Sequence, residues 1–132
     1  MKKPSAAADA VSKKFRVLAR AAARIADEKK AEDILLLDIR GQSILADYVL
    51  LVNANSSTHA RALQDSLEDE LTLLGADPVH KDGKDSESWR VLDYGWMLVH
   101  ILQEGTRNLF ALEKLYPKAK KIAVAGEAKA AR

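Results

Sequence analysis

Residues 89–104 read WRVLDYGWMLVHILQE, and this stretch decides the fold more than any other part of the chain. Apolar and aromatic residues make up most of the sequence on either side of residues 93–96. Because successive side chains of a strand point to opposite faces of a sheet, the pattern predicts two strands joined by a tight turn. One face of the pair can join an apolar core, while the other presents aromatic and ionisable groups on a stiff support.

Alternation divides the aromatic residues of this stretch between the two faces. Trp89 and Asp93 fall on one face of the first strand, and Tyr94 falls on the other. Large aromatic side chains on rigid backbone are typical anchors of protein-binding surfaces, although ordinary hairpins contain them too. We therefore expect one of Trp89 and Tyr94 to be structural.

Helical and extended patterns alternate along the rest of the chain. Apolar residues at three- and four-residue steps predict a helix from Val11 to about Lys30. A short apolar run at residues 34–37 predicts a strand buried on both faces, and residues 48–52 predict a second strand. The capping candidates at residues 55–57 open a further helix.

The remaining elements complete one domain. The second helix is expected to end at Gly75, before a short edge strand at residues 78–80. A last helix is expected over residues 104–116, because Pro117 bars its continuation. This order predicts a single-domain α/β (α+β) fold, with a mixed sheet of about five strands flanked by helices.

The domain has expected limits at residues 11–117. Residues 1–10 are small and polar and predict a flexible N-terminal tail. Residues 118–132 are basic and rich in Ala and Lys, and we expect them to form a frayed C-terminal tail. No internal repeat and no second domain is evident.

Charge is distributed unevenly along the 132 residues. Residues 1–30 have a net charge of +6, and residues 117–132 have +4. Residues 31–116 hold seven Lys/Arg and fifteen Asp/Glu, a net charge of −8. An acidic body repels phosphate backbones and attracts a basic protein, so nucleic acid is expected to bind at most peripherally, through the basic tails. Acidity can equally serve solubility alone.

Composition excludes several other classes of protein. The chain has no cysteine, which excludes a disulfide framework, thiolate metal sites and a catalytic thiol. No apolar run approaches the roughly 18 residues of a membrane span, and the N-terminus lacks an apolar signal core, so we expect a cytoplasmic protein without membrane contact. The glycines stand alone and the three histidines lack metal-ligand spacing, so no cofactor is expected.

Three aspartates keep an enzymatic alternative open. Asp38, Asp47 and Asp93 each begin or end an expected strand, and carboxylates at strand ends can hold Mg²⁺ for nucleotidyl transfer. Such sites usually need paired carboxylates on one strand and a backbone phosphate cradle, and the sequence shows neither. A binding protein is therefore favoured over a small Mg-dependent nucleotidyltransferase-like enzyme.

A series of short motifs runs along residues 12–117. They are KAEDILLLDIRG at 30–41, ADY at 46–48, NSS at 55–57, His80, Trp89 with LDYG at 92–95, VHI at 99–101, QE at 103–104, Arg107 and LEKLY at 112–116. In their order and spacing, these pieces together resemble the ribosomal silencing factor family, also called RsfS or Iojap-like proteins. Trp96 and Leu102 depart from the family pattern, in which an acidic residue and a Phe are usual.

The resemblance implies both a fold and an activity. The fold is related to nucleotidyltransferases but lacks their catalysis, so the chain is not expected to be an enzyme. The implied activity is binding of the large ribosomal subunit through its fourteenth protein, on the face that meets the small subunit. This binding would block subunit joining and repress translation. The resemblance also implies a homodimer.

Carried over by position, the resemblance implies a partner-binding surface. Its central residues are Trp89, Leu92, Asp93, Tyr94 and His100. The neighbouring members are Asp47, Tyr48, His80, Glu104 and Arg107. On such a surface carboxylates would accept hydrogen bonds from Lys or Arg of the partner, while aromatic rings exclude water around them.

Overall fold

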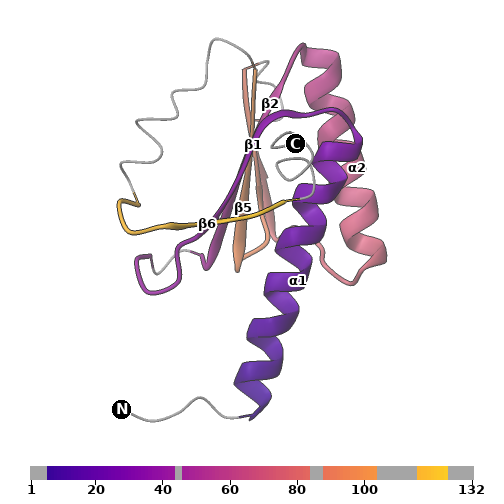
Figure 1. Cartoon of the computed structure of the whole chain (residues 1–132). Helices are drawn as coiled ribbons and strands as arrows, with labels where there is room; N and C mark the ends of the chain where they lie inside the picture. The colour runs from indigo at the N-terminus through magenta and orange to yellow at the C-terminus, as the bar shows by residue number, and fades with distance from the viewer. Residues whose placement is uncertain (1–5, 44–45, 84–87, 104–115, 125–132) are drawn as a thin grey trace.

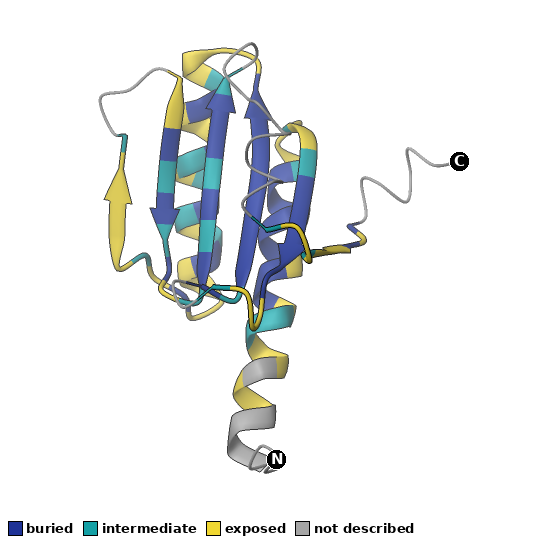
Figure 2. Cartoon of the chain, turned by 90° about the vertical axis from the view of Figure 1, so that its left-hand side faces the viewer, coloured by how far each residue is buried: buried dark blue, intermediate teal, exposed yellow. Residues whose placement is uncertain are grey.

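Two helices lie on one face of a six-stranded sheet in the computed structural model, which describes residues 6–43, 46–83, 88–103 and 116–124, without the side chains of residues 6–9 and 12 (Figure 1). The helices are α1 (Ala6–Glu28) and α2 (Ser57–Leu73). The strands are β1 (Glu32–Asp38), β2 (Tyr48–Ala54), β3 (His80–Asp82), β4 (Trp89–Asp93), β5 (Met97–Gln103) and β6 (Lys120–Ile122). In Figure 2 the opposite face of the sheet is turned to the viewer and both helices lie behind it.

The sheet is mixed, with the strand order β3-β4-β5-β2-β1-β6. Every neighbouring pair is antiparallel except β2 and β5, which run parallel from the pair Tyr48–Met97 to the pair Ala54–Gln103. A parallel pair needs a long crossover connection, and α2, β3 and β4 lie within it. The arrangement confirms the expected α+β class and mixed sheet.

The sheet has one strand more than expected. β6 lies in residues 118–132, which were expected to form a frayed tail, and it pairs with β1 through Leu36 and Ile122. The expectation was wrong for this segment because Ile122 and Val124 are buried in the core on the helix side of the sheet. The neighbouring residues in the sequence are mostly Lys and Ala, which do not indicate a buried strand.

The first expected helix begins earlier in the structure, and nearly all of the last expected helix lies outside the described residues. α1 begins at Ala6 rather than Val11, so it extends into the segment expected as a flexible tail. The Ala-rich composition of this first turn explains the difference, because Ala has the highest helix propensity. The helix expected over residues 104–116 lies outside the described residues, apart from Tyr116.

Apolar clusters lie on both faces of the sheet. On the helix face, Leu63, Leu67 and Leu71 of α2 pack with strand residues such as Leu50 and Val99. The cluster on the other face contains Leu35, Leu37, Ile39, Ala46, Val49, Leu51 and Leu102. β2 and residues 35–38 of β1 are therefore buried on both faces, as the apolar run at residues 34–37 predicted.

A capping network joins the start of α2 to the end of α1. Ser56 is the N-cap, and its hydroxyl accepts the His59 backbone N–H at 3.0 Å, which confirms the cap expected at residues 55–57. The His59 ring accepts the Asn55 N–H at Nδ1, at 3.0 Å, so its Nε2 donates to the Lys29 carbonyl at 2.8 Å. His59 thus stabilises the helix pair.

Candidate partner-binding site

The residues expected at the partner surface divide between the two faces of the sheet. Trp89 and Asp93 of β4 and His100 of β5 lie on the face opposite the helices. Leu92 and Tyr94 lie on the helix face, with only 0% and 3% of their surface exposed. Alternation therefore separated Trp89 from Tyr94 as expected, and Tyr94 is the structural one.

Buried aromatic rings support the turn between β4 and β5. The Trp96 ring stacks on Phe15 of α1, with 4.7 Å between ring centroids, and Tyr48 and Tyr94 pack around it at 6.4 Å and 6.3 Å. Burial raises the pKa of the Tyr94 hydroxyl far above its ordinary value. Tyr48 is likewise fully buried. Trp96 thus links the turn to α1, and the two buried tyrosines cannot reach a partner.

Trp89 is the exposed aromatic residue of the site. Its side chain is 41% exposed, and its indole Nε1–H donates to His100 Nδ1 at 3.0 Å. The Trp89 and His100 rings are tilted against each other, with centroids 5.8 Å apart. Burial lowers the pKa of His100 to about 4, so the ring is neutral at pH 7 and Nδ1 stays an acceptor. The indole is therefore held in place before any partner arrives.

An apolar hollow lies beside this pair. Its volume is about 170 Å³, and its lining residues are Leu37, Val49, Leu51, Trp89, Leu98, His100 and Tyr116. An apolar cavity of about 150 Å³ can hold benzene, so this hollow has room for one apolar side chain. The exposed indole and the hollow together form a site for an apolar anchor.

Two carboxylates lie near the turn between β4 and β5. Asp93 Oδ1 accepts the Gly95 N–H at 2.7 Å, which holds the turn, and the Asp93 side chain is half-buried. Asp47 precedes β2, and its backbone N–H donates to the Trp96 carbonyl at 2.9 Å. His80 is exposed on the edge strand β3 and pairs with Asp93. The remaining expected members, Glu104 and Arg107, lie outside the described residues.

The third strand-end aspartate, Asp38, forms a structural ion pair. The Arg40 side chain donates to both Asp38 oxygens, at 2.7 Å to 3.1 Å, and Arg16 lies 3.5 Å away. Burial raises the pKa of Asp38, but the Arg40 hydrogen bonds and charge outweigh it, so the pKa lies below its usual value. The described parts of the chain contain no group of three His, Asp or Glu that could hold a metal ion.

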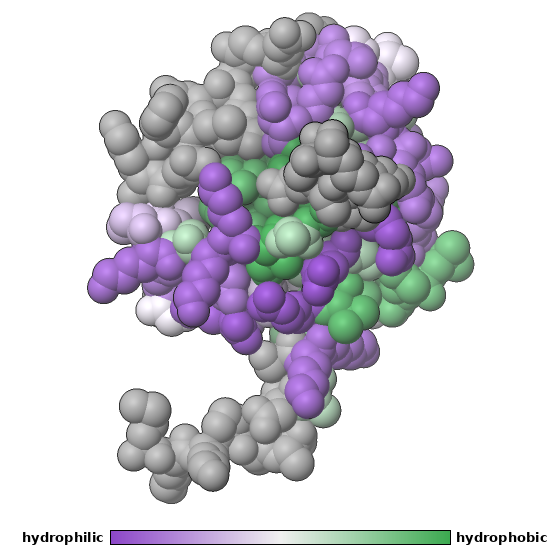
Figure 3. Space-filling view, in the orientation of Figure 1, coloured by the Kyte–Doolittle hydropathy of each residue, from purple (hydrophilic) through white to green (hydrophobic). Residues whose placement is uncertain are grey.

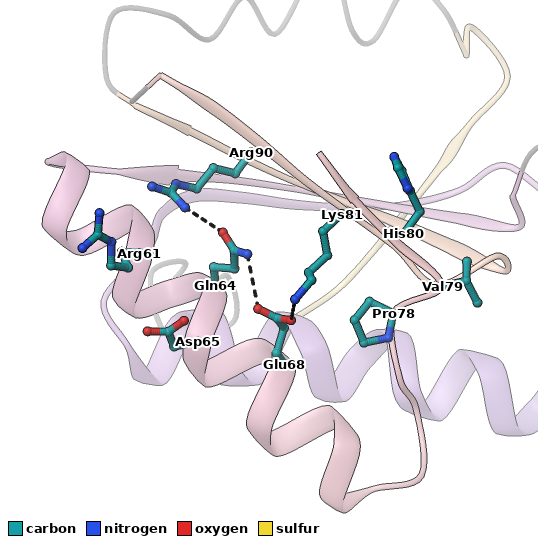
Figure 4. Close-up of a pocket in the computed structure, with 9 residues that line it drawn as sticks. All are labelled: Arg61, Gln64, Asp65, Glu68, Pro78, Val79, His80, Lys81 and Arg90. Atoms are coloured by element: carbon teal, nitrogen blue, oxygen red, sulfur yellow. Dashed lines mark hydrogen bonds and ion pairs between the residues drawn. The ribbon is translucent and has the colours of Figure 1, made fainter. Parts of the chain in front are cut away.

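Sequence reasoning missed a second polar site on the helix face of β4. Arg90 is buried there, beside a pocket that α2 and β3 also line (Figure 4). The available signal was the alternation itself, which puts a cation on the same face as Leu92 and Tyr94. A single charged residue among apolar ones on a core face needs a partner or a function.

These features define a class of protein, a single α+β domain with an exposed Trp89 and the carboxylate of Asp93 on the face of a mixed sheet opposite its helices. No described helix is long and apolar enough to cross a membrane. The chain belongs to the family described as "Ribosomal silencing factor during starvation", whose model matches residues 12–132. This family is regulatory rather than catalytic.

Individual proteins agree with the family assignment. The chain is 36% identical over 98 residues to the ribosomal silencing factor RsfS of Bacillus subtilis, covering 74% of this chain and 83% of that protein. It is 29% identical over 92 residues to the mouse protein "Mitochondrial assembly of ribosomal large subunit protein 1", covering 67% of this chain and 40% of that one. A crystal structure from Chromobacterium violaceum has the same fold, with a TM-score of 0.72, 24% identity and coverage of 83% and 91%.

Proposed function

We propose that the protein binds the large ribosomal subunit through its fourteenth protein and thereby blocks association with the small subunit, which represses translation. Family membership and the motif resemblance support a ribosomal role, and a similar mouse protein carries the large subunit in its name. The observation that carries the proposal is Trp89, an exposed indole held by His100 beside an apolar hollow.

We assign residues to the proposed contact surface according to whether their side chains are exposed. Trp89 supplies the anchor, since large aromatic residues with defined positions dominate binding energies. Asp93 and Asp47 supply negative charge for Lys and Arg of a basic ribosomal protein. Leu92, Tyr48 and Tyr94 are buried, so we leave them out of the contact surface, and substitutions there would act through folding.

The proposed mechanism is steric. The protein occupies the surface that the small subunit needs, and no covalent bond is made or broken. We place the protein in the cytoplasm and expect nucleic acid to touch it only at its basic ends. Exposed Lys13, Lys14 and Arg20 of α1 belong to one of these ends. A Mg²⁺-dependent nucleotidyltransferase would instead bind Mg²⁺ near Asp47 and Asp93, which calorimetry distinguishes.

Truncating the anchor tests the proposal directly. We expect Trp89→Ala to lose about 2 kcal/mol or more of binding free energy in co-sedimentation with purified large subunits. Asp93→Asn should weaken binding less than Trp89→Ala does, because it removes one charge and no apolar contact. The turn should survive, since the amide oxygen still accepts the Gly95 N–H. Val79→Ala, at an exposed apolar residue outside the proposed contact surface, is the control.

Subunit joining provides the second measurement. Excess wild-type protein should slow the association of the two subunits, followed by light scattering, and Trp89→Ala should not. Folded Trp89→Ala protein that pellets as well as the wild type would reject this surface.

A further inference from the structure

A pocket of about 640 Å³ lies between α2 and the edge strand β3, away from the proposed ribosome-binding face (Figure 4). Its volume falls within the range of about 300–1,000 Å³ that small-molecule sites occupy. Polar side chains from three elements line it. They are Arg61, Gln64, Asp65 and Glu68 of α2, His80 and Lys81 of β3 and Arg90 of β4.

One hydrogen-bonded chain crosses this pocket. Arg90 Nη1 donates to Gln64 Oε1 at 2.9 Å, and Gln64 Nε2 donates to Glu68 Oε2 at 3.2 Å. Lys81 Nζ donates to Glu68 Oε1 at 2.9 Å. The hydrogen bonds to Glu68 raise the pKa of Lys81. Glu68 is thus neutralised by Lys81, and within the described part of the chain the one acceptor of Arg90 is a neutral amide.

Arg90 is therefore a buried charge without a counter-charge among the described residues. Only 7% of its surface is exposed, and its Nε–H is buried without any acceptor. No described carboxylate forms an ion pair with it. A buried ion is costly unless it is paired, and an unpaired buried donor in a native protein requires an explanation.

A second guanidinium lies at the same end of the pocket. Arg61 projects from α2 one turn before Gln64, and Figure 4 shows it on the side where Arg90 reaches the helix. The three cations Arg61, Lys81 and Arg90 outnumber the two carboxylates Asp65 and Glu68. The pocket is thus locally positive within a body whose residues 31–116 carry −8.

We propose that this pocket binds the phosphate group of a small molecule between Arg61 and Arg90. Guanidinium groups suit oxyanions because their planar donors form paired, charge-assisted hydrogen bonds. A tetrahedral phosphate has enough oxygens to accept paired hydrogen bonds from both arginines at once. A carboxylate has only two oxygens, which suit one paired interaction. The phosphate supplies the missing counter-charge of Arg90, and the pocket volume leaves room for the rest of a nucleotide-sized molecule.

Calorimetry in Mg²⁺-free buffer tests the site with three probes: inorganic phosphate, adenosine monophosphate and adenosine. We expect binding of the two phosphate-bearing probes and none of adenosine. Tighter binding of the monophosphate would identify a nucleotide-like ligand, and equal binding would identify free phosphate as the ligand. Absence of heat with both phosphate-bearing probes overturns the proposal.

Two variants assign the binding to the pocket. Arg61→Met and Arg90→Met should each weaken phosphate binding at least about tenfold, because each removes charge-assisted hydrogen bonds. Arg24→Met, at an exposed position on α1 where the side chain pairs with Glu28, should bind as the wild type does. Arg90→Met should melt no lower than the wild type in phosphate-free buffer, since it removes an unpaired buried charge.

Unchanged binding in Arg61→Met overturns the proposal, and this variant decides alone if Arg90→Met does not fold. Large-subunit binding is measured separately on the same variants. Arg61→Met should still pellet with large subunits. The phosphate proposal and the ribosome-binding proposal can therefore fail independently of each other.

Discussion

Protonation of His100 would remove the acceptor that holds Trp89, so this residue pair gives the fold a dependence on pH. The folded pKa of about 4 lies below the ordinary value of 6.5. As pH falls from 6.5 to 4, the unfolded chain binds a proton that the folded protein excludes. The free energy of unfolding should therefore decrease over this window, by up to about 3 kcal/mol.

Urea unfolding of His100→Gln checks this prediction. The Gln side chain can still accept the indole N–H but does not titrate, so the fall in unfolding free energy between pH 6.5 and 4 should be smaller than in the wild type. The pKa of the Asp38 carboxyl is lowered from 3.8, so this group changes the free energy of unfolding mainly at lower pH. Equal slopes for both proteins in this window would contradict the assigned role of His100.

The sequence predicted how residues share faces but not which face is outward. Alternation correctly placed Trp89 opposite Tyr94, since it is a local property of the strand. Only the position of α1 and α2 shows that Tyr94 and Leu92 point inward. The same limit hid Arg90, because its burial depends on α2, where its partner Gln64 lies 26 positions earlier in the chain.

Among the elements, β6 is the one that the sequence did not predict. A strand of three residues is too short to show a period of two, and Lys120 and Lys121 resemble a solvated tail. β6 is a strand because its backbone pairs with the outer edge of β1. In contrast, β2 and α2 were predictable because each has a continuous apolar run or stripe.

Truncation within β6 tests its contribution. Ile122 is 4% exposed and belongs to the core on the helix side, so Ile122→Ala should reduce the free energy of unfolding by about 2–5 kcal/mol. Lys121→Ala, one residue earlier and exposed, should change it by less than about 0.5 kcal/mol. Urea unfolding measures both. Equal, small effects would mean that β6 contributes little to the core.

At the scale of the whole molecule, an exposed apolar patch lies where α1 passes the C-terminal end of α2 (Figure 3). Val17 is 67% exposed, Leu73 is 85% exposed and Leu74 is 47% exposed. Contiguous patches of this kind often mark protein interfaces. We propose that the homodimer implied by the family resemblance forms through this patch.

Sedimentation velocity tests the dimer and its surface together. The wild type should self-associate, and Leu73→Lys should shift it to the monomer, because a charge would be placed in the contact. Ala62→Lys, at an exposed residue of α2 about three turns before Leu73, is the matched control and should leave association unchanged. A wild type that stays monomeric at all concentrations would exclude self-association.

The pairing of β6 with β1 has a consequence for biosynthesis. Asp38 and Lys120 are neighbours in the sheet, although more than eighty residues separate them in the chain. While a nascent chain is still being made, β1 has no partner on that side, and an unpaired apolar edge invites association with other chains. Newly synthesised protein should therefore be most vulnerable to aggregation until residues 120–122 leave the translating ribosome, the same machine that the finished protein is proposed to restrain.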